Sequence, residues 1–266
     1  MRIDGDTTAL ITGAASGLGR VLARHIAATG ATVWLSDRDA AGLDAVAAEV
    51  RSAGGLPHHL RLDVSKEADW QAARETVGTI DVLFNNAGVA DVGPLIGSTD
   101  AAWSRQLDIN LMGVVRGCRT FAPAMVAQKR GHIVNIASFA GLALAPRMIA
   151  YNTAKAAVIA LSSSLRVELA LDGVGVSVVC PAFFPTNLTD SMTEASDEMV
   201  ERVQRWMRGS GVTADDVAAA AMRAVARDEA TVLTHPGTDE MWWRSRALPE
   251  AHRSSLVANE AARRKR

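Results

Sequence analysis

Tyr151 and Lys155 stand four residues apart in a segment that is predicted to be helical, so their side chains should share one helix face. A tyrosine phenol has a reference pKa of about 10, which makes it a poor base at neutral pH. A neighbouring ammonium favours the phenolate, and we expect it to lower the pKa of Tyr151 towards working pH. Ser138, at the end of a predicted strand, could hydrogen-bond and orient a substrate oxygen. These three residues predict an acid–base site.

A glycine-rich turn, TGAASGLG at 12–19, lies between a predicted strand and a predicted helix. Gly13, Gly17 and Gly19 permit a tight turn. They also let the backbone approach a pyrophosphate at the helix N-terminus, where free N–H groups and the helix dipole favour anions. The spacing, Gly-x3-Gly-x-Gly, differs from the common G-x-G-x-x-G form. The strand–turn–helix context nevertheless predicts a phosphate-binding loop.

Asp37 ends the second predicted strand, 18 residues after Gly19. A carboxylate there can accept a hydrogen bond from the 2′-hydroxyl of an adenosine ribose, and it would repel a 2′-phosphate. Arg38 follows directly, and an arginine in this loop can pair with a 2′-phosphate or stack on adenine. Asp37 therefore favours NAD(H) as cofactor, while Arg38 leaves NADP(H) possible.

With these motifs in order, the chain resembles the short-chain dehydrogenase/reductase family over about residues 5–237. Asp63-Val64 resembles the adenine contact of the family, and Asn85-Asn86-Ala87-Gly88 resembles its turn after the fourth strand. The catalytic tetrad of the family is matched by Asn110, Ser138, Tyr151 and Lys155. The ordered set is far more specific than a lone Tyr-x3-Lys.

The resemblance implies an NAD(P)-dependent oxidoreductase that interconverts a secondary alcohol and a ketone. Tyr151 would take the alcohol proton during oxidation or deliver it to the ketone oxygen during reduction. Lys155 would also hold the ribose hydroxyls of the nicotinamide, and Asn110 would steady a water that passes protons from Lys155 to solvent. The hydride chemistry itself belongs to the nicotinamide.

The cofactor contacts implied by these motifs run from the glycine-rich turn to the segment after the sixth strand. They are Gly13, Ser16, Gly17, Leu18, Gly19, Asp37, Arg38, Asp63, Val64, Asn86, Ala87, Gly88, Tyr151, Lys155, Pro181, Phe184 and Thr186. Where the family usually has Pro-Gly, this chain has Pro181-Ala182, which narrows the freedom of the backbone. Phe183 and Phe184 add bulk near the nicotinamide ring. Thr186 remains where the family binds the nicotinamide carboxamide.

The expected substrate pocket is almost entirely apolar. It would be lined by Leu142, Leu144, Met148, Phe183, Leu188 and Met192, with Val89 nearby. Arg147 is a nearby charge, and the sequence does not indicate whether it faces the pocket or solvent. An apolar pocket gains free energy from every apolar surface that it buries, so it predicts a hydrophobic or bulky ketone or secondary alcohol.

Predicted strands and helices alternate along the chain. The strands are expected at 7–12, 31–37, 58–64, 80–88, 131–138, 175–181 and 230–236, and the helices at 17–29, 40–53, 66–77, 100–128, 150–171 and 214–227. Apolar strands joined by helices predict an α/β fold: one doubly wound, Rossmann-like parallel sheet with helices on both faces. We expect a single domain over 1–240, with 186–212 as an insertion that covers the substrate site, and a basic extension at 241–266.

The composition excludes several classes of protein. Of the 266 residues, 48% are hydrophobic and 21% are charged, which is typical of a globular protein and excludes general disorder. No apolar run is long enough for a transmembrane helix, and the N-terminus lacks the apolar stretch of a secretory signal. Two isolated cysteines, Cys118 and Cys180, favour the cytoplasm. No His/Cys spacing matches a metal site.

Charge is unevenly spread. The net charge is −1, but residues 241–266 carry +5 and the rest carries −6, so we expect no binding of nucleic acid. The terminal run at 261–266, AARRKR, predicts a disordered end. Trp242-Trp243 could anchor at a lipid surface, but packing against a neighbouring subunit is favoured. The resemblance implies a homotetramer or homodimer, formed through the helices at 100–128 and 150–171.

Three alternatives stay open at this point. The chain could be a non-catalytic NAD(P)-binding regulator, a peripheral membrane protein that uses its tail, or a dehydratase or epimerase with the same tetrad. The complete acid–base set argues against a simple binder, because binding alone does not require it.

Overall fold

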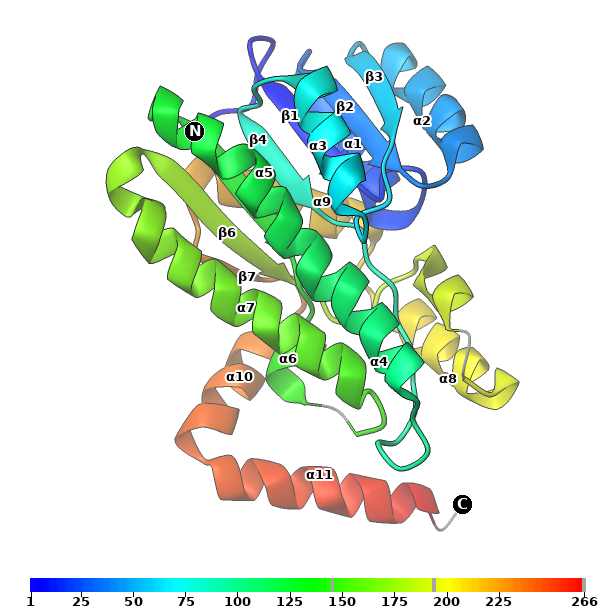
Figure 1. Cartoon of the computed structure of the whole chain (residues 1–266). Coiled ribbons are helices and arrows are strands. Elements are labelled where there is room, and N and C mark those ends of the chain that lie inside the picture. Colours follow the sequence, from blue (N-terminus) through cyan, green and yellow to red (C-terminus); the bar gives the residue numbers. More distant parts are fainter. Residues whose placement is uncertain (145, 193–194, 265–266) are drawn as a thin grey trace.

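Seven parallel strands form one sheet in the order β3-β2-β1-β4-β5-β6-β7 (Figure 1). The computed structural model describes residues 1–144, 146–192 and 195–264. The strands are β1 (Thr8–Thr12), β2 (Thr32–Asp37), β3 (Leu56–Arg61), β4 (Val82–Asn85), β5 (Gly131–Ile136), β6 (Val174–Cys180) and β7 (Thr231–Leu233). Every neighbouring pair of strands is parallel, so the predicted doubly wound, Rossmann-like α/β fold is confirmed.

Helices connect these strands. In the first half they are α1 (Gly17–Ala27), α2 (Ala40–Ser52), α3 (Glu67–Val77), α4 (Asp100–Leu107), η1 (Asp108–Met112) and α5 (Gly113–Gln128). In the second half they are α6 (Ala140–Ala143), α7 (Ile149–Leu169), η2 (Ala170–Asp172), η3 (Asn187–Ser191), α8 (Asp197–Arg208), α9 (Ala214–Arg227), α10 (Thr238–Ala247) and α11 (Pro249–Arg264).

Apolar side chains bury both faces of the sheet. Leu22 of α1, Val46 of α2 and Val217 of α9 pack in one core, and Trp70 of α3 and Phe121 of α5 pack in the other together with α7. Figure 1 shows α5 and α7 lying in front of the sheet. Strands β4 and β5 are buried along their whole length, as expected where helices cover both faces.

The strand order reverses between β1 and β4. From β1 the chain builds outward through β2 and β3, and from β4 it builds in the opposite direction towards β7. In open α/β sheets the crevice beyond the carboxyl ends of the strands at such a reversal is where ligands bind. The turns after Thr12 of β1 and Asn85 of β4 meet at this place.

The helix predicted at 100–128 is divided. A single π-helical turn, η1, separates α4 from α5 and contains Asn110. A π turn accommodates one extra residue, so it changes the side of the helix on which the following residues lie, and such turns are frequent at functional sites. The strand predicted at 58–64 lies instead at Leu56–Arg61. Among the described residues, no helix is both long and apolar enough to cross a membrane.

Two helices, α10 and α11, occupy the region that the sequence assigned to a basic extension, and we call them the C-terminal arm. Figure 1 shows α10 leading down from the body of the molecule and α11 lying across the bottom of the view, apart from the sheet. The prediction of a disordered end is wrong for Ala261–Arg264, which belong to α11. Alanine is the strongest helix former, which favours continuation of the helix through Ala261 and Ala262. Residues 265–266 lie outside the described residues.

Candidate active site

The turns after β1 and β4 are tied together by the side chains of Asn86 and Thr12. The Asn86 Nδ2 atom donates to the carbonyl oxygens of Thr12 (2.8 Å) and Gly13 (3.2 Å), and its backbone N–H donates to Thr12 Oγ1 (3.0 Å). A Cβ atom on Gly13 would lie 2.8 Å from the Cα of Ala87, and Gly13 has a φ of +65°. Only glycine fits here without moving the backbone. The predicted Asn86-Ala87 segment therefore lies directly against the glycine-rich turn.

The N-terminus of α1 is left open. Its N-cap, Ser16, makes no side-chain capping bond, and the first turn contains no acidic residue. Gly17 has a φ of +51°, and a Cβ placed on it would lie 3.7 Å from the Cβ of Thr186. The first-turn N–H groups of a helix bind anions when no side chain caps them. The residues at this helix N-terminus fit a pyrophosphate group, and Thr186 lies close to Gly17 beside it.

Asp37 lies beside the same turn. Its Oδ2 accepts from the N–H of Ala15 (3.1 Å) and its Oδ1 from the N–H of Asp39 (3.1 Å). Burial would raise the pKa of Asp63, but hydrogen bonds from Ser65 and the positive charges of Lys66 and Arg38 outweigh it and hold that pKa below its usual value.

Four predicted contacts complete this side of the site. Val64 is buried, and its carbonyl accepts from the indole of Trp70 (3.0 Å). Leu18 is buried in the core beside α1, as is Phe184. Gly19 packs so closely on Gly13 that a side chain would not fit.

Ser138, Tyr151 and Lys155, which we call the catalytic cluster, are each more than nine-tenths buried. The Ser138 hydroxyl lies close enough to Tyr151 to act on the pKa of its phenol. Ser138 Oγ also donates to the Pro181 carbonyl (3.3 Å) and accepts from the N–H of Ala140 (3.1 Å). The hydroxyl is therefore held in place by groups on both sides of it.

Lys155 lies one turn after Tyr151 on α7. Its Nζ donates to the Ile136 carbonyl at the end of β5 (2.9 Å) and lies 5.8 Å from the centre of the Tyr151 ring. A Cβ on Gly88 would lie 3.4 Å from this Nζ and 2.9 Å from Asn110 Oδ1. Lys155 and Asn110 thus converge on Gly88.

The protonation of this cluster differs from the sequence prediction. Burial raises the pKa of Tyr151 to about 12, although the nearby Ser138 hydroxyl acts in the opposite direction. Burial lowers the pKa of Lys155 to about 8. The prediction that the pKa of Tyr151 is lowered is therefore wrong for the chain without cofactor. Removal from water disfavours the phenolate more than the neighbouring groups favour it.

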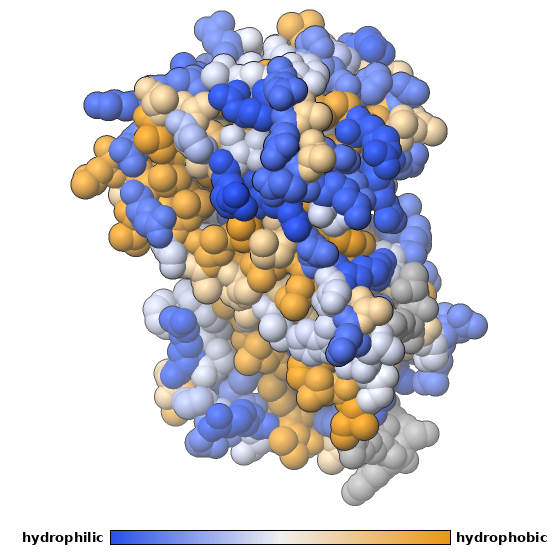
Figure 2. Space-filling view, in the orientation of Figure 1, coloured by the Kyte–Doolittle hydropathy of each residue, from blue (hydrophilic) through white to orange (hydrophobic). Residues whose placement is uncertain are grey.

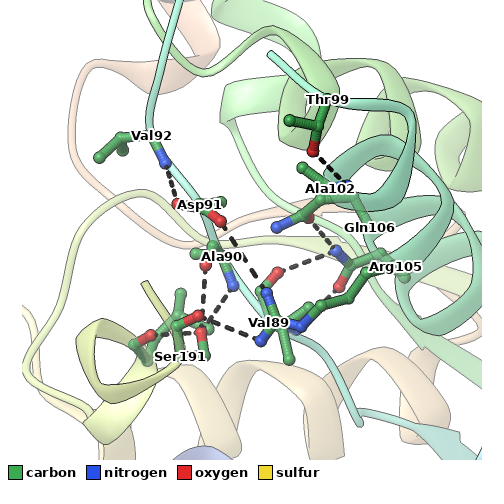
Figure 3. A network of polar contacts seen from close by, with 11 residues as sticks. Val89, Ala90, Asp91, Val92, Thr99, Ala102, Arg105, Gln106 and Ser191 are labelled. Carbon is green, nitrogen blue, oxygen red and sulfur yellow. Dashed lines mark hydrogen bonds and ion pairs between the residues drawn. The ribbon is translucent and has the colours of Figure 1, made fainter. Parts of the chain in front are cut away.

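Every polar atom of the Asn110 side chain is in use. Its Oδ1 accepts from the N–H of Val89 (3.0 Å), and its Nδ2 donates to the Val89 carbonyl (2.8 Å) and to Gln106 Oε1 (2.6 Å). Figure 3 shows Val89 near Ser191 of η3, whose hydroxyl accepts from the N–H of the next residue, Ala90 (2.8 Å). The sequence did not single out Gln106, although a polar residue four positions before Asn110 is a usable signal for a helical contact.

Four predicted pocket residues gather over Tyr151, and we call them the apolar wall: Met148, Phe183, Leu188 and Met192. They pack together with Val203 and Met207 of α8. The structure does not bring Leu142 and Leu144 to this group. Leu142 packs against the core on the α5 and α7 side, and Leu144 is exposed.

Val89 is buried, while Arg147 faces solvent. The Arg147 guanidinium binds Glu260 Oε1 of α11 through Nε (3.1 Å) and Nη2 (3.0 Å). Its charge is therefore engaged by the C-terminal arm.

A second residue that the sequence did not single out is His235, just after β7. Its Nδ1 lies 3.2 Å from the Ala182 nitrogen, and its Nε2 lies 2.8 Å from the Phe183 oxygen. More than fifty residues separate it from this loop, so no local pattern in the sequence could have indicated the contact.

The chain is similar to known proteins over most of its length. Residues 7–197 match the family model described as short chain dehydrogenase. The probable oxidoreductase EphD of Mycobacterium tuberculosis is 34% identical over 264 residues, which cover 94% of this chain and 45% of EphD. The chain thus spans about half the length of that relative. Cyclopentanol dehydrogenase of Comamonas sp. is 36% identical over 195 residues, covering 71% of this chain and 78% of that protein.

Solved structures agree with this. A short-chain dehydrogenase/reductase from Burkholderia phymatum in complex with NAD is 36% identical, with a TM-score of 0.87, over 94% of this chain and 96% of that one. One from Sphingobium yanoikuyae in complex with NADPH is 30% identical, with a TM-score of 0.77, over 95% of each chain. By sequence and by fold, this chain belongs to the short-chain dehydrogenase/reductase family.

Proposed function

We propose that this chain is an NAD(P)-dependent alcohol dehydrogenase or ketoreductase, with Tyr151 as the acid and base. The observation that carries the proposal is that Ser138, Tyr151 and Lys155 are buried together, with Lys155 one helical turn after Tyr151. An acid and a base must lie within hydrogen-bond reach of the atom they serve. A substrate oxygen placed between the Ser138 and Tyr151 hydroxyls meets that condition.

In this proposal Ser138 orients the oxygen, and Tyr151 exchanges a proton with it. The Lys155 ammonium supports the phenolate, and a pKa near 8 lets Lys155 pass its own proton on near neutral pH. Asn110 has no free side-chain atom, since all its polar groups bind Val89 and Gln106. We therefore assign its contribution to holding the segment around Gly88 beside Lys155 and to its main chain.

The cofactor would lie along the carboxyl edge from the glycine-rich turn to Tyr151. When bound, a nicotinamide cofactor accepts or supplies the hydride. Its pyrophosphate would meet the open N-terminus of α1, and its nicotinamide would lie between Thr186 and Lys155. The solved relatives with NAD and with NADPH support either form. We favour NAD(H), because Asp37 is anchored beside the turn by Ala15 and would repel a 2′-phosphate.

The substrate in this proposal is a bulky, apolar ketone or secondary alcohol. The apolar wall faces Tyr151 with methionine, leucine and phenylalanine side chains, and Arg147 is engaged elsewhere by Glu260. The similarity to cyclopentanol dehydrogenase supports a cyclic or hydrophobic alcohol. Residues 186–212 would cover this site, since η3, the residue after it and α8 supply Leu188, Met192 and Val203.

We further propose a homotetramer or homodimer in the cytoplasm. Figure 2 shows apolar residues gathered on the face where α5 and α7 lie. On α7 and just after it, Val167 is 77% exposed and Leu171 is 98% exposed, which favours an interface with another copy. Cys118 and Cys180 are buried free thiols, which suits a reducing compartment.

A substrate panel tests the proposal. Purified protein is mixed with NADH or NADPH and a series of ketones, or with NAD or NADP and alcohols, and the absorbance of the reduced nicotinamide is followed. We expect bulky or cyclic ketones to react faster than small hydroxy acids and phosphorylated sugars. The reverse order would contradict the apolar substrate. Product formation without any nicotinamide absorbance change would instead indicate a dehydratase or an epimerase.

A further inference from the structure

His235 contacts two successive residues of the loop after β6. The His235 ring lies two residues beyond the end of β7 and reaches across to Ala182 and Phe183. The Ala182 N–H donates to Nδ1 (3.2 Å), and Nε2 lies 2.8 Å from the Phe183 carbonyl oxygen. These are the positions at which the chain departs from the Pro-Gly that its family usually has.

The two contacts define the tautomer of the ring. A backbone N–H can only donate, so Nδ1 must carry the lone pair that accepts from Ala182. A carbonyl oxygen can only accept, so Nε2 must carry the hydrogen that points to Phe183. Neutral His235 with its proton on Nε2 satisfies both bonds at once. The Thr234 hydroxyl, 2.9 Å from Nδ1, can donate to the same atom.

His235 is itself held from the other side. Its backbone carbonyl accepts from the Thr238 hydroxyl (2.6 Å) and the Thr238 N–H (3.3 Å), at the start of α10. The ring of His235 lies 6.5 Å from the ring of Phe184. The first turn of the C-terminal arm therefore fixes the residue that in turn contacts the loop.

The loop divides its side chains between two sites. Phe183 packs in the apolar wall over Tyr151, and its ring lies 5.4 Å from the ring of Trp206 on α8. Phe184 packs on the opposite side, in the core beside α1 that underlies the glycine-rich turn. A rotation of the peptide groups between Ala182 and Phe184 would misplace both rings together. The bonds to His235 oppose that rotation.

The preceding residue is tied separately. The Pro181 carbonyl accepts from the N–H of Phe139 (2.8 Å) and from the Ser138 hydroxyl (3.3 Å). Position 181 is therefore held by the segment after β5, and positions 182 and 183 are held by His235. Alanine at 182 lacks the conformational freedom of glycine, so fewer backbone conformations are open to the loop. The hydrogen bonds to His235 then stabilise one of them.

We propose that His235 is a positioning residue that fixes the loop at 182–184, so that Phe183 shapes the substrate site and Phe184 and Thr186 lie correctly for the cofactor. This proposal rests on the proposed function for its catalytic consequence. His235 takes no part in the acid–base step in this proposal, because Ser138, Tyr151 and Lys155 are held by β5, α7 and Pro181. Loss of His235 should weaken binding and leave the pH dependence of kcat unchanged.

Three substitutions separate the two bonds. His235→Phe keeps a ring and removes both. His235→Asn places an acceptor near the position of Nδ1 and cannot reach the Phe183 carbonyl, while His235→Gln places a donor near the position of Nε2 and loses the acceptor. His25→Phe is the matched control, because His25 lies in the last turn of α1 and contacts Asp215 instead.

The first measurement needs no turnover. Amide hydrogen exchange of the cofactor-free chain reports the bond from the Ala182 N–H directly. We expect exchange at Ala182 to become faster in His235→Phe and His235→Gln, and to stay closer to wild type in His235→Asn and His25→Phe. Unchanged exchange at Ala182 in His235→Phe would overturn the proposal, whatever the enzyme is found to do.

The second measurement is binding of NADH, followed by fluorescence, together with KM and kcat on an accepted ketone. Each lost bond should weaken binding about five- to tenfold, and His235→Phe should show the largest loss. The kcat pH profile and the melting temperature should remain near those of wild type. A fall in melting temperature that accounts for all the lost activity would assign His235 a purely structural role and overturn the proposal. Failure of the wild type to bind any nicotinamide cofactor would contradict the proposed function instead, and the exchange experiment would still stand.

Discussion

The catalytic cluster and the apolar wall meet at Tyr151, but they are held by different forces. Ser138 and Lys155 are fixed by hydrogen bonds to main-chain groups at the ends of β5 and β6, and they are almost fully buried. Leu188 and Met192 of the wall come from η3 and the segment after it, and pack through apolar contacts with α8. Hydrogen bonds define direction, whereas apolar packing defines only volume.

This difference separates chemistry from selectivity. Proton transfer needs atoms placed to within a few tenths of an ångström, and the cluster supplies that through the sheet. The wall includes Met148 and Met192, and methionine side chains are flexible and adapt to irregular shapes. We infer that the cluster sets the reaction and that the wall sets which ketone or alcohol fits. The following substitutions test each half.

The largest effect is expected from Tyr151→Phe. The change removes one oxygen from the cluster and leaves the ring that packs against the apolar wall. Turnover should fall by about 10²–10⁴-fold, the usual contribution of a general acid or base, while NADH binding stays nearly intact. Steady-state kinetics and fluorescence titration measure the two effects. Activity within tenfold of wild type would show that another group transfers the proton.

Lys155→Met should lower turnover as well, but raise the stability of the cofactor-free chain. Lys155 is 3% exposed, and burial lowers its pKa from 10.5 to about 8. The unfolded chain therefore binds a proton more readily than the folded chain does between about pH 8 and 10.5, so the wild type gains stability as pH rises through that range. Below pH 8, burial of the charged Lys155 destabilises the folded chain by its full amount, roughly 3 kcal/mol from the pKa difference.

Methionine removes the cost of burying a charge. It also leaves the Ile136 carbonyl without its hydrogen-bond donor, which lowers the free energy of unfolding by about 1–3 kcal/mol. We expect a net rise of a few degrees in melting temperature at pH 7, and a narrower margin over wild type at pH 9.5. Thermal unfolding at both pH values measures this. A variant that is less stable than wild type at pH 7 would show that Lys155 contributes more through its hydrogen bond than it costs by burial.

The cluster could be predicted from the sequence because its geometry follows from short rules. Tyr151 and Lys155 are four apart on a helix, and Ser138 and the glycine-rich turn end parallel strands at one edge of the sheet. Those rules need no knowledge of distant contacts. The pKa of Tyr151 could not be obtained this way, because it depends on how completely the folded chain removes the phenol from water.

The wall and its supports depend on loops that no periodicity describes. Leu142 and Leu144 are two residues apart in one apolar stretch, yet one packs in a core and the other is exposed. The π turn at Asp108–Met112 interrupts a continuous helical pattern, and nothing in the apolar spacing marks it. His235 reaches its loop through the fold alone. Contacts of this kind come from tertiary packing.

Asp37→Ala should shift cofactor choice by a smaller factor. The carboxylate would repel a 2′-phosphate, so its loss should move the ratio of kcat/KM for NADPH to that for NADH upward by about tenfold. Both values should fall somewhat, since Asp37 also accepts from the Ala15 N–H of the glycine-rich turn. Asp39→Ala is a matched control, because Asp39 caps α2 by accepting from the Gly42 N–H. A wild type that already prefers NADPH would show that Arg38 sets the choice.

The smallest effect is expected from removing the end of the C-terminal arm after Glu260, the residue of α11 that binds Arg147. A chain that stops after Glu260 keeps the bonds from Arg147 to Glu260 and loses only residues 261–266, so its rate constants should match wild type within about twofold. A chain that stops after Leu248 also loses α11, and Arg147 then loses its partner. The Arg147 side chain is 43% exposed, and exposed pairs contribute about 0.2–1 kcal/mol, so the substrate KM should rise by no more than about fivefold. Glu260→Gln should reproduce that rise if the ion pair causes it. A tenfold or larger loss of kcat/KM on removing 261–266 alone would contradict this division, and it would place those residues in the substrate site or in the assembly.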